Sequence, residues 1–146
     1  MRSLVRAIGI AGGILVLAGV QNASAQITNL VEFTTAFGFT VGNATVPAGS
    51  YTIKPDDDAP NILIMTGAHG DVIFQTENKN QKSIPSKTEV LFNRYGDGYV
   101  LKGIQVEGSE TGYVTIPVEG ERHVTKRGAS NGEQRVAARK RADTSK

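Results

Sequence analysis

The histidines are the first side chains to test for catalysis or metal binding, and the chain has two, His69 and His123. Neither belongs to a His-Glu-x-x-His motif, and the absence of cysteine removes the usual partners of a structural zinc site. His69 follows Gly67 in a glycine-rich segment that is typical of a turn. We interpret His69 as an exposed turn residue and expect no metal site.

The carboxylates and hydroxyls are the next candidates for chemistry. Asp56, Asp57 and Asp58 are consecutive, whereas a calcium loop alternates its acidic ligands so that they surround one ion. Asp97 lies between two glycines, which favours a role in forming a turn. A nucleophilic triad also needs a serine, a histidine and a carboxylate held together in space. We therefore assign no catalytic residue and no cofactor.

Tyrosines form the most suggestive group of candidate ligand contacts. Aromatic side chains at strand ends can stack on sugar rings or line the mouth of a barrel. The same residues can instead pack in the core, and the sequence leaves both interpretations open. The four candidates are Tyr51, Tyr95, Tyr99 and Tyr113.

The N-terminal segment has the pattern of a secretory signal peptide. Arg2 and Arg6 precede an uncharged, mostly apolar run, and Ala23-Ser24-Ala25 is a small-x-small cleavage site. The apolar run is too short to span a bilayer. We predict that residues 1–25 are removed and that the mature chain, in the periplasm or outside the cell, has no transmembrane anchor.

Charge is distributed unevenly along the chain. Residues 26–120 contain six basic and eleven acidic side chains, whereas residues 121–146 contain eight basic and three acidic ones. The second segment is also poor in apolar residues, so we predict a mostly disordered basic tail. Its candidate anion contacts are Arg135, Arg139, Lys140 and Arg141. Export makes an anionic envelope component or a glycan the expected partner, and not nucleic acid.

Residues 26–120 are predicted to form one all-β domain, a small antiparallel sandwich or barrel. Apolar and polar residues alternate in several short segments that are separated by glycine and proline turns. The seven expected strands cover about 31–41, 50–54, 62–65, 72–76, 89–95, 99–106 and 113–116. The uninterrupted apolar run Ile62–Met65 predicts a strand that is buried on both faces.

A β-bulge is predicted in the sixth of these strands. Tyr99 and Leu101 share one face, but Ile104 and Val106 have the opposite parity. One extra residue at Gly103 would return all four to the same face. The expected core consists of Phe33, Phe37, Phe39, Tyr51, Ile53, Ile62, Ile64, Phe74, Leu91, Tyr99, Leu101, Ile104 and Val106.

Three sequence segments carry a resemblance to a family. They are Val31-x-Phe33-x-x-x-Phe37-x-Phe39-x-Val41-Gly42, Val46-Pro47-Ala48-Gly49-x-Tyr51-x-Ile53, and Glu89-Val90-Leu91-Phe92-x-x-Tyr95-Gly96-x-x-Tyr99-x-Leu101. Over about residues 31–113 the chain resembles small exported bacterial proteins, mainly from acidobacteria, of uncharacterised function. Val46 replaces the leucine usual before Pro-Ala-Gly in that pattern, and the basic segment after Pro117 is an addition. The resemblance implies no active site.

These observations favour an exported, non-catalytic β domain that has a binding or structural role at the cell envelope. The alternative is a small secreted hydrolase or isomerase whose site lies near His69, with Asp71 or Asp97 as its carboxylate. The position of His69 separates the two, because a catalytic histidine needs a concave site and a carboxylate within hydrogen-bond reach. The sequence does not indicate the ligand or the oligomeric state.

Overall fold

The computed structural model describes residues 29–119, 121, 128 and 130–142. The predicted signal peptide and His123 lie outside these residues. The strands are β1 (Asn29–Thr35), β2 (Phe39–Val41), β3 (Ala44–Val46), β4 (Gly49–Pro55), β5 (Ile62–Gly67), β6 (Gly70–Asn80), β7 (Glu89–Tyr95), β8 (Gly98–Gln105), β9 (Thr111–Thr115) and β10 (Gly132–Ala142).

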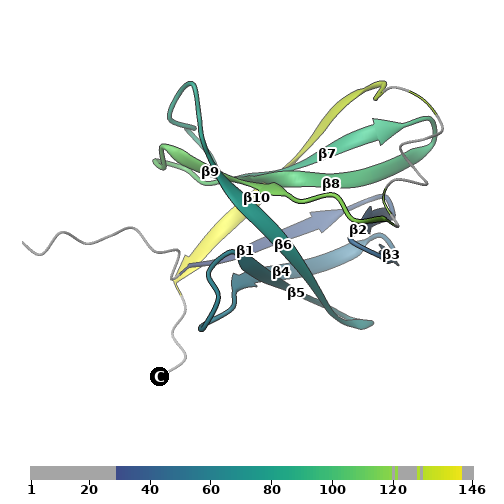
Figure 1. Cartoon of the computed structure of the whole chain (residues 1–146), viewed down its shortest axis with the longest axis horizontal. Helices are drawn as coiled ribbons and strands as arrows, with labels where there is room; N and C mark the ends of the chain where they lie inside the picture. Colours follow the sequence, from purple (N-terminus) through teal and green to yellow (C-terminus); the bar gives the residue numbers. More distant parts are fainter. Residues whose placement is uncertain (1–28, 120, 122–127, 129, 143–146) are drawn as a thin grey trace, which may run out of the picture.

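Eight of these strands close an antiparallel barrel (Figure 1). Around the barrel the order is β1, β4, β5, β6, β9, β8, β7 and β10, and β10 pairs again with β1. Two connections cross over neighbouring strands, since β6 is followed by β7 and β9 is followed by β10. Closure pairs both edges of every barrel strand and leaves no open sheet edge in the ring. The all-β prediction is confirmed, and the barrel alternative is the one that forms.

The β2–β3 hairpin lies outside the ring of eight strands and adds three residues to the core, Phe39, Val41 and Val46. Phe39 and Val41 are 2% and 0% exposed. The hairpin turns at Gly42, whose φ of 59° is the left-handed conformation that glycine adopts without a steric penalty. β2 is attached to the barrel by one parallel pairing, between Thr40 and Val100.

Large apolar side chains fill the interior of the barrel. The rings of Phe39 and Phe92 lie 4.9 Å apart, and Phe33 and Tyr51 lie 5.7 Å apart. These ring contacts belong to a core cluster to which strands on all sides of the barrel contribute. An eight-stranded barrel is narrow enough for its side chains to fill it, which leaves a packed core in place of an open lumen.

The C-terminal strand corrects the prediction of a mostly disordered tail. Residues 132–142 form β10, which has six register pairs with β7 and five with β1 (Figure 1). Val136 and Ala138 point inward and pack against the core. The tail prediction is therefore wrong for these residues, and the barrel extends beyond the predicted domain end at Gly120.

The first predicted strand is divided in two. β1 ends at Thr35 and β2 begins at Phe39, and the chain bends between them. The Thr35 hydroxyl donates a hydrogen bond to the carbonyl oxygen of Phe37, 2.6 Å away, and this bond stabilises the bend. Apolar and polar residues alternate without interruption through Ala36 and Gly38, so the sequence pattern does not indicate the break.

The prediction that both faces of the strand at Ile62–Met65 are buried is wrong. Leu63 and Met65 are buried at 3% and 1% exposure, whereas Ile62 and Ile64 are only half-buried on the outer face. Met65 pairs with Ile53 of β4, whose side chain is in the core. This register determines the inward face, because residues that pair directly across strands point to the same side.

The predicted bulge at Gly103 is confirmed. Phe92 pairs with Leu101 while Leu91 pairs with Gly103, so β8 contains one extra residue at this point. Leu101 and Ile104 consequently both belong to the core cluster. The absence of a side chain at Gly103 has a second consequence, since a Cβ atom there would overlap the carbonyl oxygen of Tyr113 on β9.

Candidate functional site

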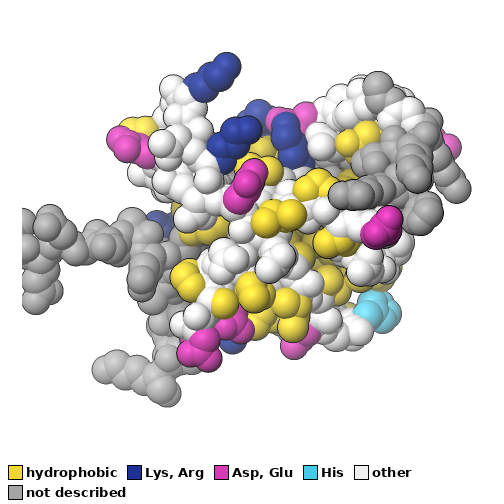
Figure 2. Space-filling model, in the orientation of Figure 1, with side chains coloured by type: hydrophobic (Ala, Val, Ile, Leu, Met, Phe, Trp, Pro, Cys, Tyr) yellow, Lys and Arg dark blue, Asp and Glu magenta, His cyan; other side chains and the backbone are white. Residues whose placement is uncertain are grey.

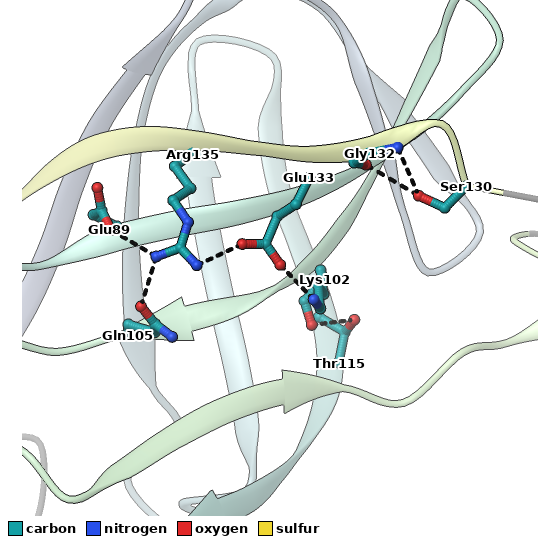
Figure 3. A network of polar contacts seen from close by, with 8 residues as sticks. All are labelled: Glu89, Lys102, Gln105, Thr115, Ser130, Gly132, Glu133 and Arg135. Carbon is teal, nitrogen blue, oxygen red and sulfur yellow. Dashed lines mark hydrogen bonds and ion pairs between the residues drawn. The ribbon is translucent and has the colours of Figure 1, made fainter. Parts of the chain in front are cut away.

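A row of ion pairs crosses β7, β8 and β10 on the outside of the barrel (Figure 3). Arg135 is central: its Nη1 lies 3.2 Å from Glu89 Oε2, and its Nη2 lies 2.7 Å from Glu133 Oε1. Lys102 forms a further ion pair with Glu133. The side chain of Glu89 is only 9% exposed. The row therefore connects the C-terminal strand to two other strands through side chains as well as through the backbone.

The ion pairs shift the pKa values of two of these groups. The hydrogen bond from Lys102 lowers the pKa of the Glu133 carboxyl below its usual value. The hydrogen bond to Glu89 raises the pKa of Arg135, which remains a cation throughout the physiological range. Glu133 and Arg135 are therefore both charged at neutral pH.

A polar hollow of about 340 Å³ lies beside this row, and we call it the loop hollow. Its floor is made by Glu89, Gln105 and Arg135, and its wall is the connection between β6 and β7. The wall residues that line it are Gln81, Ser83, Ile84, Pro85, Ser86 and Lys87.

Backbone hydrogen bonds attach the wall of the loop hollow to the β8–β9 loop and to β10. The Gln81 amide donates to Glu110 O at 2.8 Å, and the Gly108 amide donates to Pro85 O at 3.0 Å. Thr88, the last residue of the connection, accepts a hydrogen bond from Ala138 N at its carbonyl oxygen, 3.0 Å away. The connection has no regular secondary structure, but it is attached at its start, middle and end.

A second, larger hollow of about 530 Å³ lies on the outer face of β4, β1 and β10, and we call it the strand hollow. Small side chains form it: Thr34 and Ser50 hydrogen-bond each other at 2.8 Å, and Ala137 lies beside them. Arg139 and its register partner Glu32 lie at one side.

A third hollow, of about 170 Å³, is apolar. It is lined by Ile73 and Ile116, which are 67% and 40% exposed. Figure 2 shows apolar side chains gathered on this face, over β5, β6 and β9, with charged groups nearer its borders. The described residues on this face do not indicate what would cover it.

The tyrosines do not converge on one site. Tyr51 is 6% exposed and belongs to the core cluster, and Tyr99 and Tyr113 pack against the same cluster. Tyr99 stacks on Phe37 with a centroid distance of 4.0 Å. Core packing accounts for the positions of these three, Tyr51 also lines the strand hollow, and their role as ligand contacts stays a prediction. Tyr95 ends β7 and is half-buried, and its role as a ligand contact stays a prediction.

All four predicted anion contacts lie on β10, and they differ in whether they form ion pairs with carboxylates of the described residues. Arg135 is paired with Glu89 and Glu133, and Arg141 Nη1 lies 3.0 Å from Glu32 Oε1. Arg139 and Lys140 are exposed and form no ion pair within the described part of the chain. The sequence identified these cations, but it could not identify carboxylates 46 and 109 residues away as their partners.

His69 lies in the two-residue turn between β5 and β6 and is exposed. Its side chain makes no hydrogen bond within the described residues, and Asp97 belongs to a different hairpin, between β7 and β8. Nor do the described residues contain a group of three or more histidine or carboxylate side chains that could hold a metal ion. This position does not provide the concave site that the hydrolase alternative requires.

One serine motif was missed in the sequence interpretation. Residues 128–132 have the Gly-x-Ser-x-Gly spacing of a nucleophile elbow, with Ser130 at its centre. An elbow follows a strand and precedes a helix, whereas Ser130 precedes β10. Its Oγ donates to Gly132 O at 3.0 Å, a local bond at the start of the strand (Figure 3). The context does not fit a nucleophile.

A buried carboxylate was also missed. Glu121 is 2% exposed, and its Oε1 accepts a hydrogen bond of 2.6 Å from the amide of Gly42. Burial raises the pKa of this carboxyl, and the bond from Gly42 opposes that shift. The contact joins the segment after β9 to the β2–β3 turn. It spans 79 residues, so local sequence carries no signal for it.

Comparisons with protein-family models, curated proteins and solved structures give no match. The resemblance to exported acidobacterial proteins stays a prediction. Within the described residues, no helix has the length and apolar character needed to cross a membrane.

Proposed function

We propose that this chain is an exported, non-catalytic barrel that binds an anionic polysaccharide of the cell envelope through its outer surface. The observation that carries this proposal is the filled interior. Seven large side chains, from Phe39 to Leu101, are less than 2% exposed, so side chains fill the interior at these positions within the described part of the barrel. Binding would therefore use the outside of the barrel.

The outer surface around β10 has the groups that such a ligand requires. Arg139 is an exposed cation that lines the strand hollow together with the hydroxyls of Thr34 and Ser50, and Lys140 is a second exposed cation on the other side of β10. Cations attract an acidic polymer, and hydroxyls exchange hydrogen bonds with sugar hydroxyls. Because β10 is a barrel strand, these groups are held in fixed positions and bind without the full entropic cost of ordering a free tail.

Binding assays with the chain from Gln26 to Lys146 test the proposal. We expect retention on an acidic polysaccharide that weakens with added salt, since exposed charges are screened over about 8 Å at physiological ionic strength. Arg139→Glu should weaken retention strongly. Lys79→Glu, an equal charge change at an exposed position on β6, is the matched control and should have a smaller effect.

Three results would count against the proposal. Equal losses in the two variants would show that only net charge matters, and binding to anionic vesicles in preference to the polysaccharide would indicate a lipid partner. Turnover in a panel of ester, glycoside and peptide substrates, abolished by His69→Ala, would favour the hydrolase instead.

A further inference from the structure

We infer that the loop hollow is a binding site for one carboxylate-bearing sugar unit, an inference that rests on the proposed function and specifies its ligand. The hollow has a volume of about 340 Å³, which is within the range of small-molecule sites. Its groups come from the β6–β7 connection, from β7 and β8, and from β10. The site therefore exists only when the C-terminal strand is in the barrel.

The hydrogen-bonding groups that remain available in the hollow are mainly donors. Both oxygens of Glu89 are engaged, Oε1 with Lys87 at 3.1 Å and Oε2 with Arg135 at 3.2 Å. Gln105 uses its carbonyl oxygen to accept from Arg135 at 3.3 Å, which leaves its amide NH₂ group free among the described residues (Figure 3). Lys87 is 69% exposed and keeps further ammonium protons for a ligand. Such a site suits a ligand with acceptor oxygens.

The charge of the hollow favours a carboxylate over a neutral group. Its lining contains two cations, Lys87 and Arg135, and one carboxylate, Glu89. Glu89 is nearly buried beneath its two partners, so a ligand carboxylate would meet the cations before it met this negative charge. Hydrogen bonds between an ammonium or guanidinium group and a carboxylate are stronger than neutral ones.

The wall of the hollow adds the features that fit a sugar ring. Ser83 and Ser86 supply hydroxyls that both donate and accept. Ile84, at 58% exposure, and Pro85 supply an apolar edge against which the C–H face of a sugar can lie. The hydrogen bonds at Gln81 and Pro85 hold this wall in place before a ligand arrives, which lowers the entropic cost of binding.

Nuclear magnetic resonance titration of the chain from Gln26 to Lys146 tests this site with three probes. Glucuronate has both a carboxylate and a ring, glucose has only the ring, and acetate has only the carboxylate. We expect glucuronate to shift the backbone amides of residues 81–88 and Gln105, with affinity about tenfold or more above that for glucose or acetate. Equal responses to acetate and glucuronate would overturn the inference, as would shifts that lie away from the hollow.

Variants separate the hollow from the general charge of the barrel. Gln105→Ala and Lys87→Gln should each weaken glucuronate binding about tenfold, the effect expected for one hydrogen bond to a charged group. Lys79→Gln makes the same charge change as Lys87→Gln at an exposed position on β6 that does not line the hollow, and it should leave binding nearly unchanged. A loss of the same size in Lys79→Gln would overturn the assignment. Thermal unfolding of each variant shows that the fold is retained.

The same variants distinguish failure of this inference from failure of the proposed function. If acidic polysaccharide is retained by wild-type protein and equally by Gln105→Ala, while glucuronate causes no shift, the hollow is not the site but the function stands. If wild-type protein does not retain the polysaccharide, the function fails as well.

Discussion

The ring of Tyr51 on β4 covers Gly67, its register partner on β5. A Cβ atom on Gly67 would lie 2.5 Å from Cε1 of that ring, a distance that side chains do not tolerate. An aromatic residue that covers a cross-strand glycine compensates for the packing that glycine lacks. This pair lies at the end of β5, where the strand turns towards β6 through residues 68 and 69.

Gly67→Ala should destabilise the barrel by about 1–3 kcal/mol, the usual cost of overpacking a core. Urea denaturation at neutral pH measures the change in the free energy of unfolding. Thr66→Ala, at the exposed neighbouring position, is the control and should change it by less than about 0.5 kcal/mol. An unchanged midpoint in Gly67→Ala would mean that the Tyr51 ring does not occupy this position.

Gly103→Ala should cost more than Gly67→Ala, about 3 kcal/mol or above, because its Cβ would meet backbone and not a side chain. The carbonyl of Tyr113 belongs to the strand pairing between β8 and β9, so it cannot rotate away without breaking the barrel closure. Loss of the cooperative thermal transition, followed by circular dichroism, is the expected result. A stable Gly103→Ala protein would contradict the close approach of the two strands.

Parity along the chain made the bulge predictable. Leu101 and Ile104 must face the same core but are separated by an odd number of positions, and this mismatch is visible in the sequence. The run Ile62–Met65 carries no such information, because every position in it is apolar. There only pairing with β4 decides which residues point inward.

Pairing between distant segments explains the other missed features. Among its described side chains β10 contributes only Val136 and Ala138 to the core, so its sequence lacks the apolar alternation of a strand. The strand forms because its backbone pairs with β1 and β7. The sequence of residues 132–142 alone does not indicate either pairing. The sequence predicted Arg135 as an anion contact. Because its neighbours are distant along the chain, the sequence could not predict that Arg135 lies beside Glu89 and the β6–β7 connection.

Alkaline pH should destabilise the barrel through Tyr51. Its hydroxyl donates to the carbonyl oxygen of Pro47, and burial raises the pKa of this hydroxyl above its usual value of 10.0. Because the folded pKa is the higher one, this stabilisation is fully present below pH 10 and is lost as the pH rises through the folded pKa. Tyr51→Phe should cost about 1 kcal/mol at neutral pH and should reduce the alkaline loss.

Urea denaturation at a series of pH values between about 8 and 11 checks this expectation. Tyr113, whose pKa is also raised by burial, should supply part of the alkaline loss that remains in Tyr51→Phe. If Tyr51→Phe has the same pH dependence as the wild-type protein, the Tyr51 hydroxyl does not titrate in the buried position.

Glu121 should make the barrel less stable as the pH rises above the usual range of a carboxyl. Burial raises the folded pKa of this carboxyl above its usual value of 4.5, so its contribution to stability is fully present below that value and is lost as the pH rises through the folded pKa. Glu121→Gln keeps an oxygen that can accept from Gly42 but removes the titration. We expect Glu121→Gln to be as stable as wild type or more stable at pH 7, with a flatter dependence between about pH 4 and 7.

Thermal unfolding midpoints at a series of pH values compare Glu121→Gln with wild-type protein. Glu119→Gln, a substitution at an exposed carboxylate two residues away, is the matched control and should leave the dependence unchanged. A lower stability of Glu121→Gln at pH 7 would show that the negative charge itself stabilises the β2–β3 turn.

Truncation after Gly120 should prevent folding, because it removes β10 and leaves the edges of β1 and β7 unpaired. We expect the chain from Gln26 to Gly120 to lack a cooperative thermal transition and to aggregate, whereas a chain ending at Ala142 should unfold like the full chain. Circular dichroism and size-exclusion chromatography measure both properties. A peptide of residues 128–142 added to the short chain should restore the barrel by supplying the missing strand. A short chain that folds alone, with the unfolding transition of the full chain, would instead return residues 121–146 to the status of a dispensable tail.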